Sequence, residues 1–336
     1  MNELLTPFAT RPLDNSFAPD EYQDARAFYD REGFVVIRGL ITRNACAAVR
    51  DALAQEVRPS RVPILRQQNM KYERNRFGEH GLLENPIFNV QDLDDRSHGA
   101  FRRAALQALT GEAVARWTAC LLAAPATKLI QSMFFEAPAG TWAHQDSYYQ
   151  DSATGLGQCV AGWFALEDIE EDAGRFYVCP RSHKALAVIR NEGALDFALG
   201  HDVYKTVVQE AIAAHGWQLH APALKQGDVL FWNSLTVHGS FAGGGRGASR
   251  TSLTAHYLAD EDEMLQFHTR IRRQKMVTYN GMRVGLLHDQ SRLRNRLVRD
   301  AAFRFPRAYA LARRAALTAL LRLPRGKASA VVRDAG

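Results

Sequence analysis

In LKQGDVLFWNSLTVHGSFAGGGRGASRTSLTAHY, residues 224–257, two β-rich runs stand on either side of a glycine-rich turn. These runs, residues 227–234 and 249–258, contain the branched and aromatic side chains that strands favour. Three similar runs precede them: LIQSMFFEA (129–137), QCVAGWFALED (158–168) and GRFYVCP (174–180). Turns containing Gly, Pro or Asp separate the runs, and strands at this spacing indicate an antiparallel sandwich or barrel.

Helical patterns flank this β region. We expect helices at residues 20–32, ending at Gly33, at about 44–57, beginning after Thr42, at about 97–122 and at about 292–323. The fold class is therefore mainly β with flanking helices. We predict one domain over residues 1–267, with a helical part at 1–124 and a β core at 125–260. A basic helical extension at 268–336 is expected to pack on or beside that domain.

The amino-acid composition limits which classes of protein this chain can belong to. The 336 residues are 46% hydrophobic and 23% charged, which is typical of a globular protein with a sizeable core. No run approaches the roughly 20 apolar residues of a membrane-spanning helix, and the first residues do not resemble a secretory signal. The four cysteines lack the paired spacing of a zinc site, so we interpret them as reduced thiols. These features favour a cytoplasmic protein.

Charge is distributed unevenly along the chain. Residues 268–336 hold 17 Lys and Arg against three Asp and Glu, whereas the rest of the chain is acidic overall. Residues 304–323, RFPRAYALARRAALTALLRL, combine basic and apolar side chains as interfacial helices do. Peripheral contact with an anionic membrane is one interpretation, and packing on the core or on a partner subunit is the other. The tail lacks the interleaved aromatic residues of a nucleic-acid-binding segment, so we expect no nucleic-acid partner.

A candidate metal site begins at His144 and Asp146. Residues i and i+2 of a strand share a face, so both side chains can reach one ion. A second histidine, His238, follows another β-rich run. Two histidines and one carboxylate form the facial triad of non-haem iron(II) oxygenases, which leaves positions open for a co-substrate and dioxygen.

Twelve residues after His238, Arg250 stands on the next β-rich run. A guanidinium can bind a carboxylate through two parallel hydrogen bonds, as an anchor for 2-oxoglutarate requires. Ser252 shares the strand face of Arg250 and could add a hydroxyl contact. His256 shares that face too, and we interpret it as a packed or surface histidine.

The sequence resembles the phytanoyl-CoA dioxygenase family. The matching segments are WAHQDSYYQD (142–151), GWFALEDIEEDAGRFYVCPRSHK (162–184), residues 224–257 and the opening segment 21–53. The resemblance implies a double-stranded β-helix (a jelly roll, cupin-like), Fe(II), 2-oxoglutarate, dioxygen and oxidation of an unactivated C–H bond. It also implies that Ser240, Trp163 and Gln131 lie near the co-substrate.

Departures from the family pattern occur at residues 174–176 and 180–183, and the first of them could place the cation of Arg175 near the substrate. Asp146 is retained, and its replacement by Gly or Ala in related enzymes opens a halide site, so halogenation is disfavoured. Four other residues are candidate substrate contacts: Tyr148 and Tyr149 after the triad turn, and Arg66 and Lys71 in the irregular basic segment before the core.

Three functions remain open. The first is a 2-oxoglutarate-dependent hydroxylase of a small or lipid-like molecule, and the basic tail and loop arginines favour an anionic one. The second uses the same cofactors for desaturation, cyclisation or epimerisation in a biosynthetic pathway. The third is a non-catalytic β-barrel binding protein, which the combination of His144, Asp146, His238 and Arg250 disfavours. The sequence does not indicate an oligomeric state.

Overall fold

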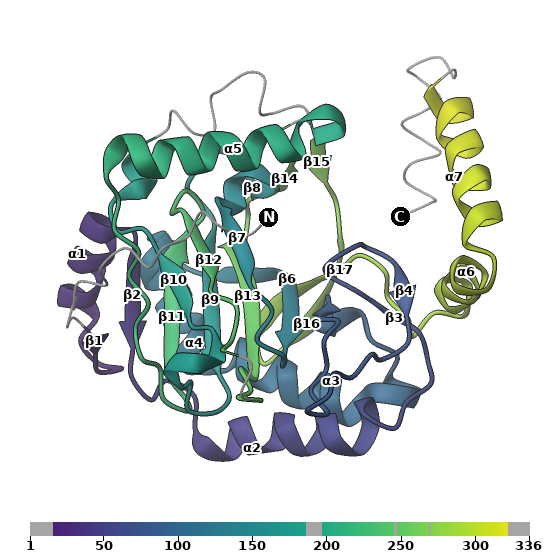
Figure 1. The fold of residues 1–336 in the computed structure, drawn as a ribbon, viewed down its shortest axis with the longest axis horizontal. Coiled ribbons are helices and arrows are strands. Elements are labelled where there is room, and N and C mark those ends of the chain that lie inside the picture. Colours follow the sequence, from purple (N-terminus) through teal and green to yellow (C-terminus); the bar gives the residue numbers. More distant parts are fainter. Residues whose placement is uncertain (1–15, 186–196, 245–246, 269, 322–336) are drawn as a thin grey trace.

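The computed structural model describes residues 16–185, 197–244, 247–268 and 270–321. Its centre is a nine-stranded mixed sheet with the order β1-β2-β11-β9-β13-β6-β17-β16, and β5 pairs with β6 (Figure 1). The strands are β1 (Ser16–Phe17), β2 (Phe34–Ile37), β5 (Ile87–Phe88), β6 (Thr127–Phe135), β9 (Val160–Ala165), β11 (Val229–Asn233), β13 (Ser252–Ala259), β16 (Lys275–Tyr279) and β17 (Met282–Leu286).

Three smaller sheets complete the β structure. The order β10-β12-β7 joins Phe176–Val178, His238–Ser240 and Thr141–His144, and it forms the wall opposite the large sheet. The order β15-β14-β8 joins Arg270–Arg272, Met264–Gln266 and Gln150–Ser152, and β3 (Ile64–Leu65) pairs with β4 (Tyr72–Glu73). Together the sheets form the expected jelly-roll core, in which buried side chains lie between the two walls.

Helices surround this core. They are α1 (Tyr22–Glu32), α2 (Arg43–Ala52), α3 (Asp95–Thr110), α4 (Glu112–Leu122), α5 (Phe197–His215), α6 (Leu293–Arg304) and α7 (Pro306–Leu321). Helices α2 and α3 run along the bottom of Figure 1, and α5 crosses the top. The apolar side of α1–α4 joins the main core, where Phe101, Trp117 and Phe134 are fully buried. Among the described residues, no helix has both the length and the apolar character needed to cross a membrane.

Local signals set several helix ends. Helix α1 ends at Gly33, which adopts a left-handed conformation with φ of 82°. The side chain of Thr42 accepts a hydrogen bond from the Ala45 N–H and begins α2. The helical pattern expected over 97–122 is divided into α3 and α4 because Gly111 is extended. The pattern expected over 292–323 is divided at Pro306, which disfavours a helical conformation in the preceding Phe305 and begins α7.

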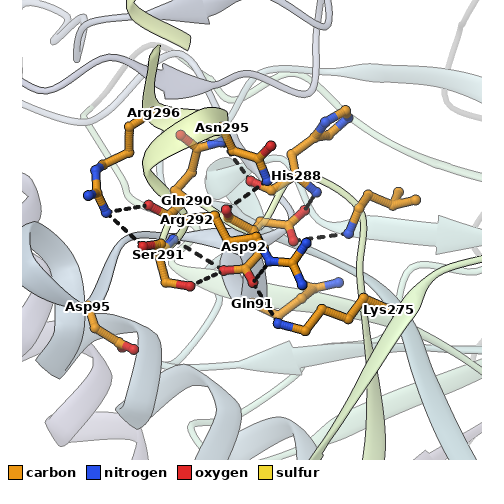
Figure 2. A network of polar contacts seen from close by, with 12 residues as sticks. Gln91, Asp92, Asp95, Lys275, His288, Gln290, Ser291, Arg292, Asn295 and Arg296 are labelled. Atoms are coloured by element: carbon orange, nitrogen blue, oxygen red, sulfur yellow. Dashed lines mark hydrogen bonds and ion pairs between the residues drawn. The ribbon is translucent and has the colours of Figure 1, made fainter. Parts of the chain in front are cut away.

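The carboxylate of Asp92 attaches the C-terminal part of the chain to the core (Figure 2). It accepts hydrogen bonds from the backbone N–H groups of Leu287 (3.1 Å) and His288 (3.0 Å) and from the Asn89 amide (3.0 Å). The predicted extension 268–336 thus contains a strand hairpin, β16–β17, that extends the main sheet, and its helical part begins at Leu293. The domain division at residue 268 stays a prediction.

Candidate active site

Two antiparallel strands bring the predicted metal ligands together. In the pairing of β7 with β12, His144 lies directly opposite His238, and their ring centroids are 4.3 Å apart. Asp146 lies just beyond β7, in the short 3-10 turn η3 (Asp146–Tyr148). Its Oδ1 is 3.8 Å from His144 Nε2 and 3.5 Å from His238 Nε2. The turn, rather than strand alternation alone, therefore directs the carboxylate toward the two imidazoles.

The hydrogen bonds of both histidines fix their ring orientation. His144 Nδ1 is 2.8 Å from the Trp142 carbonyl oxygen, and His238 Nδ1 is 2.9 Å from the Thr236 carbonyl oxygen. Because a carbonyl can only accept, each Nδ1 carries the hydrogen, and each Nε2 presents a lone pair to the centre. Such backbone partners are the usual support of metal-ligating imidazoles.

Electrostatics keep these groups in the protonation states that a metal needs. Burial, together with the neighbouring His238, lowers the pKa of His144 to about 3, so the imidazole is neutral at physiological pH. Burial alone would raise the pKa of Asp146, but the imidazoles of His238 and His256 hold it well below its usual value. One carboxylate and two imidazoles, with ligand atoms within 4.8 Å of one another, fit a divalent iron ion.

A cavity of about 490 Å³, its open mouth included, extends from these ligands into the barrel. Its lining combines five large apolar or aromatic side chains with polar and charged ones: Gln67, Met133, Phe135, Thr141, His144, Asp146, Trp163, Phe176, Trp232, His238, Gly239, Ser240, Arg250, Thr254 and His256. The metal ligands and Arg250 thus share one enclosed space.

Arg250 is a buried cation without an acidic partner among the described residues. It is 2% exposed, and its guanidinium donates to the carbonyl oxygens of Gly174 and Ala139, whereas its Nε–H finds no acceptor within the described ranges. Burial lowers its pKa to about 10, so the group remains charged at neutral pH. A buried charge is costly unless an anion faces it, so the site fits the distal carboxylate of 2-oxoglutarate. Gly174 has φ of 68°, and a Cβ there would clash with the Phe241 carbonyl oxygen.

The other residues proposed for co-substrate binding fall into two groups. Ser240 and Trp163 line the cavity, where Trp163 stacks on Phe176 with ring centroids 6.0 Å apart. Ser252 and Gln131 are absent from the lining. Ser252 is buried and donates its hydroxyl to the Arg250 carbonyl oxygen, and Gln131 lies opposite His256 in the β6–β13 pairing.

The proposed substrate residues are more dispersed. Tyr148 is buried and stacks on Tyr204 of α5 at 3.7 Å, and Tyr149 is half-buried with its ring edge toward His144. Arg175 is half-buried beside the cavity-lining Phe176 but is not itself part of the lining.

In the segment before the core, the two candidates lie in different environments. Arg66 is fully buried, and its guanidinium donates to the carbonyl oxygens of Asn85 and Glu73 and to the Asn75 side chain. Lys71 is exposed. The cavity is reached instead by Gln67, which follows Arg66 in the chain.

Sequence reasoning did not single out Trp232, Thr254 or Gln67 as site residues. Trp232 lies in the β-rich run 227–234, where its aromatic side chain indicates a core position. Thr254 lies on β13, four residues after Arg250 and two before His256, so the period of two was the signal that could have identified it. No local pattern distinguishes Gln67, because a long loop carries it to the cavity.

Comparisons with known proteins agree with this geometry. The profile of the family described as "Phytanoyl-CoA dioxygenase (PhyH)" matches residues 29–251. Peroxisomal phytanoyl-CoA dioxygenase from Bos taurus is 23% identical over 271 residues, which cover 72% of this chain and 73% of that protein. The Mus musculus protein of the same name is 23% identical over 254 residues, or 67% and 68% of the two chains.

Two solved structures have a similar fold. The non-haem, α-ketoglutarate-dependent carbocyclase SnoK from nogalamycin biosynthesis is 18% identical, with a TM-score of 0.55 over 74% of this chain and 88% of that one. EctD from S. alaskensis, solved with 2-oxoglutarate and 5-hydroxyectoine, is 17% identical, with a TM-score of 0.51 over 83% and 94%. Because the family profile spans most of the chain and includes all three candidate metal ligands, this protein belongs to the phytanoyl-CoA dioxygenase family of iron(II)- and 2-oxoglutarate-dependent oxygenases.

Proposed function

We propose that this protein hydroxylates an unactivated C–H bond of a small or lipid-like molecule and releases succinate and carbon dioxide. The observation that carries the proposal is the position of the buried Arg250 cation in the same cavity as the His144, Asp146 and His238 ligands. A dicarboxylate is the ligand that such a cavity fits, because one carboxylate can meet the guanidinium while the other end reaches the metal ligands.

The residues of the chain would divide the work as follows. His144, Asp146 and His238 would hold iron(II), and Arg250 would hold the distal carboxylate of 2-oxoglutarate. When bound, iron(II) and 2-oxoglutarate would supply the electrons that reduce and activate dioxygen, and 2-oxoglutarate would be oxidised to succinate and carbon dioxide. Met133, Phe135 and Phe176 form an apolar wall that excludes water and favours an aliphatic group of the substrate. Gln67 adds an amide to this wall and would orient a polar group of the substrate.

Cyclisation or epimerisation with the same cofactors is the second candidate, and the fold similarity to the carbocyclase SnoK favours it. Product mass distinguishes the outcomes, since hydroxylation adds one oxygen atom, oxidative cyclisation and desaturation each remove two hydrogens, and epimerisation leaves the mass unchanged. The retained carboxylate of Asp146 supports all of these over halogenation.

Anaerobic addition of Fe(II) and 2-oxoglutarate tests the proposal directly. We expect the weak visible charge-transfer band of such a complex in the unmodified chain, and succinate once air is admitted. Asp146→Ala should lower succinate formation more than about 100-fold, because even outer partners of ligands contribute 10–100-fold. The exposed acid Asp168 provides the matched control, and Asp168→Ala should behave as the unmodified chain does. A folded, metal-loaded chain without the band would contradict the proposal.

We also propose that α6 and α7 contact an anionic membrane surface. Three apolar side chains of this segment, Leu297, Phe305 and Leu311, are 60%, 65% and 69% exposed. They lie within residues 268–336, which contain 17 basic and three acidic residues. Helix α6 packs on β4 and on α7 at the edge of the molecule (Figure 1). Exposed apolar groups among cations are the features that bind an interfacial helix to anionic lipids.

Co-sedimentation with anionic and neutral vesicles tests this contact on the full chain. We expect binding to anionic vesicles that is lost when Leu297, Phe305 and Leu311 are all changed to Gln. The matched control changes three exposed apolar residues elsewhere, Phe77, Val203 and Ile271, to Gln. Equal sedimentation of the two triple variants would contradict the proposal. It would also be contradicted if the unmodified chain formed a dimer in solution that the Leu297, Phe305 and Leu311 variant dissociated, since these side chains would then contact a second copy of the chain.

A further inference from the structure

The two oxygens of Asp146 have different surroundings. Oδ1 faces the Nε2 atoms of His144 and His238, at 3.8 and 3.5 Å. Oδ2 turns the other way and accepts a 2.8 Å hydrogen bond from the indole Nε1–H of Trp232, which is itself 1% exposed. One carboxylate oxygen therefore faces the two histidines of the proposed metal site, and the other oxygen is held by a hydrogen bond from Trp232.

A second group lies against the same oxygen. His256 Nε2 is 3.1 Å from Oδ2, although the contact lacks the alignment of a full hydrogen bond, and His256 Nδ1 has no hydrogen-bond partner in the part of the chain that the structure describes. His256 is 1% exposed and lines the cavity, yet it stands outside the set of ligand atoms that cluster within 4.8 Å. His256 thus lies beside the proposed ligand Asp146 and is not one of the three proposed ligands.

These two residues come from the opposite wall of the barrel. Trp232 lies on β11 and His256 on β13, both in the large sheet, whereas His144 and His238 lie on the small sheet. The terminal torsion of a carboxylate has a broad energy profile, so its plane turns easily unless neighbours fix it. A buried hydrogen bond from a rigid indole, itself packed against Phe176 and His238, provides such a constraint.

We propose that Trp232 is a positioning residue for the iron ligand Asp146, and that His256 supports it, so that Oδ1 alone is directed to the metal. The inference rests on the proposed iron site and adds the residues that orient it. Because the constraint crosses between the two sheets, the geometry of the metal site depends on how the barrel walls pack. Outer partners of this kind change metal affinity by about 10–100-fold.

Titration of the metal-free protein with Co(II), followed by visible absorption, tests the proposal without turnover. Trp232→Phe retains an aromatic ring but loses the donor, and we expect Co(II) to bind about 10-fold or more weakly, with a changed d–d spectrum. The matched control is Trp117→Phe, since Trp117 is a buried indole that donates to the Pro19 carbonyl oxygen far from the site. We expect this control to bind Co(II) as the unmodified chain does.

A second pair of variants keeps the test decisive if Trp232→Phe does not fold. His256→Leu should weaken Co(II) binding, and His256→Gln, whose amide can reach the position of Nε2, should restore most of it. If Trp232→Phe folds, Co(II) affinity within twofold of the unmodified chain and an unchanged spectrum would overturn the inference. If Trp232→Phe does not fold, the same result in His256→Leu would overturn it. Either result would leave the proposed iron site itself standing. Failure of the unmodified chain to bind Co(II) would instead contradict the proposed iron site itself.

Discussion

The hydroxyl of Tyr204 accepts a 2.9 Å hydrogen bond from the backbone N–H of Gln145, the residue between the proposed ligands His144 and Asp146. Tyr204 belongs to α5, which covers the top of the barrel in Figure 1, and its ring also stacks on Tyr148. The Gln145 side chain donates to the Leu235 carbonyl oxygen in the loop that leads to His238. A helix outside the β core and the loop before the third ligand therefore hold the same turn.

Tyr204→Phe should weaken metal binding while the fold is retained. The change leaves the ring stacked on Tyr148 but deprives the buried Gln145 N–H of its acceptor, at a cost of about 1–3 kcal/mol in unfolding free energy. We expect a several-fold weaker affinity for Co(II), measured by titration, and a lower midpoint in urea. Tyr279→Phe is the matched control because its hydroxyl makes a long, exposed contact of 3.4 Å to Arg103. Unchanged metal affinity in Tyr204→Phe would show that the turn does not need α5.

Arg250→Lys should weaken 2-oxoglutarate binding more than it affects metal binding. Lysine retains the positive charge but loses the two-pronged donor geometry of the guanidinium. We expect the Kd for 2-oxoglutarate to rise about 10–100-fold, which corresponds to one charged hydrogen bond. Equilibrium titration of the Fe(II)-loaded protein under nitrogen measures this constant. A Kd within twofold of the unmodified chain would place the co-substrate anchor elsewhere.

Asp92→Asn should destabilise the attachment of the C-terminal segment shown in Figure 2. Both carboxylate oxygens accept hydrogen bonds from N–H groups, so an amide nitrogen in either position would face a donor. We expect a loss of about 1–3 kcal/mol in unfolding free energy and faster hydrogen exchange at residues 284–290. Asp95→Asn is the control, because that acid is exposed and pairs with Arg102 at the surface. Equal effects of the two changes would exclude Asp92 as the attachment point.

His98 should make stability depend on pH between about 4 and 6.5. Burial lowers its folded-state pKa to about 4, below the unfolded value of about 6.5. The unfolded chain therefore takes up a proton first, so the contribution of His98 is complete above pH 6.5 and declines as the pH falls toward 4. Between pH 7 and pH 5 the unmodified chain should lose about 2 kcal/mol more than His98→Gln does. Parallel pH curves for the two proteins, from urea unfolding, would contradict this assignment.

The sequence by itself determined the features that local rules control. The alternation of side chains along the chain predicts that Arg250, Thr254 and His256 share one face, and residue types and spacing predicted His144, Asp146 and His238 as metal ligands, which the structure brings close together. Thr42 and Gly33 begin and end their helices through hydrogen bonds and backbone conformations that belong to their own neighbourhood. The order of β-rich runs also sufficed to predict an antiparallel sandwich or barrel, because that signal repeats along the chain, whereas the jelly roll was implied by the family resemblance.

Tertiary structure decided which of these elements face one another. His144 and His238 become direct partners only because β7 and β12 pair, and Trp232 reaches Asp146 only because the large sheet packs opposite the small one. The same long-range packing directs Arg66 into the interior of its own loop while Gln67 reaches the cavity. Strand pairing and burial depend on contacts between distant segments, so no local pattern specifies them. The residue types of the proposed ligands and the alternation of side chains along a strand, by contrast, are properties of each segment alone.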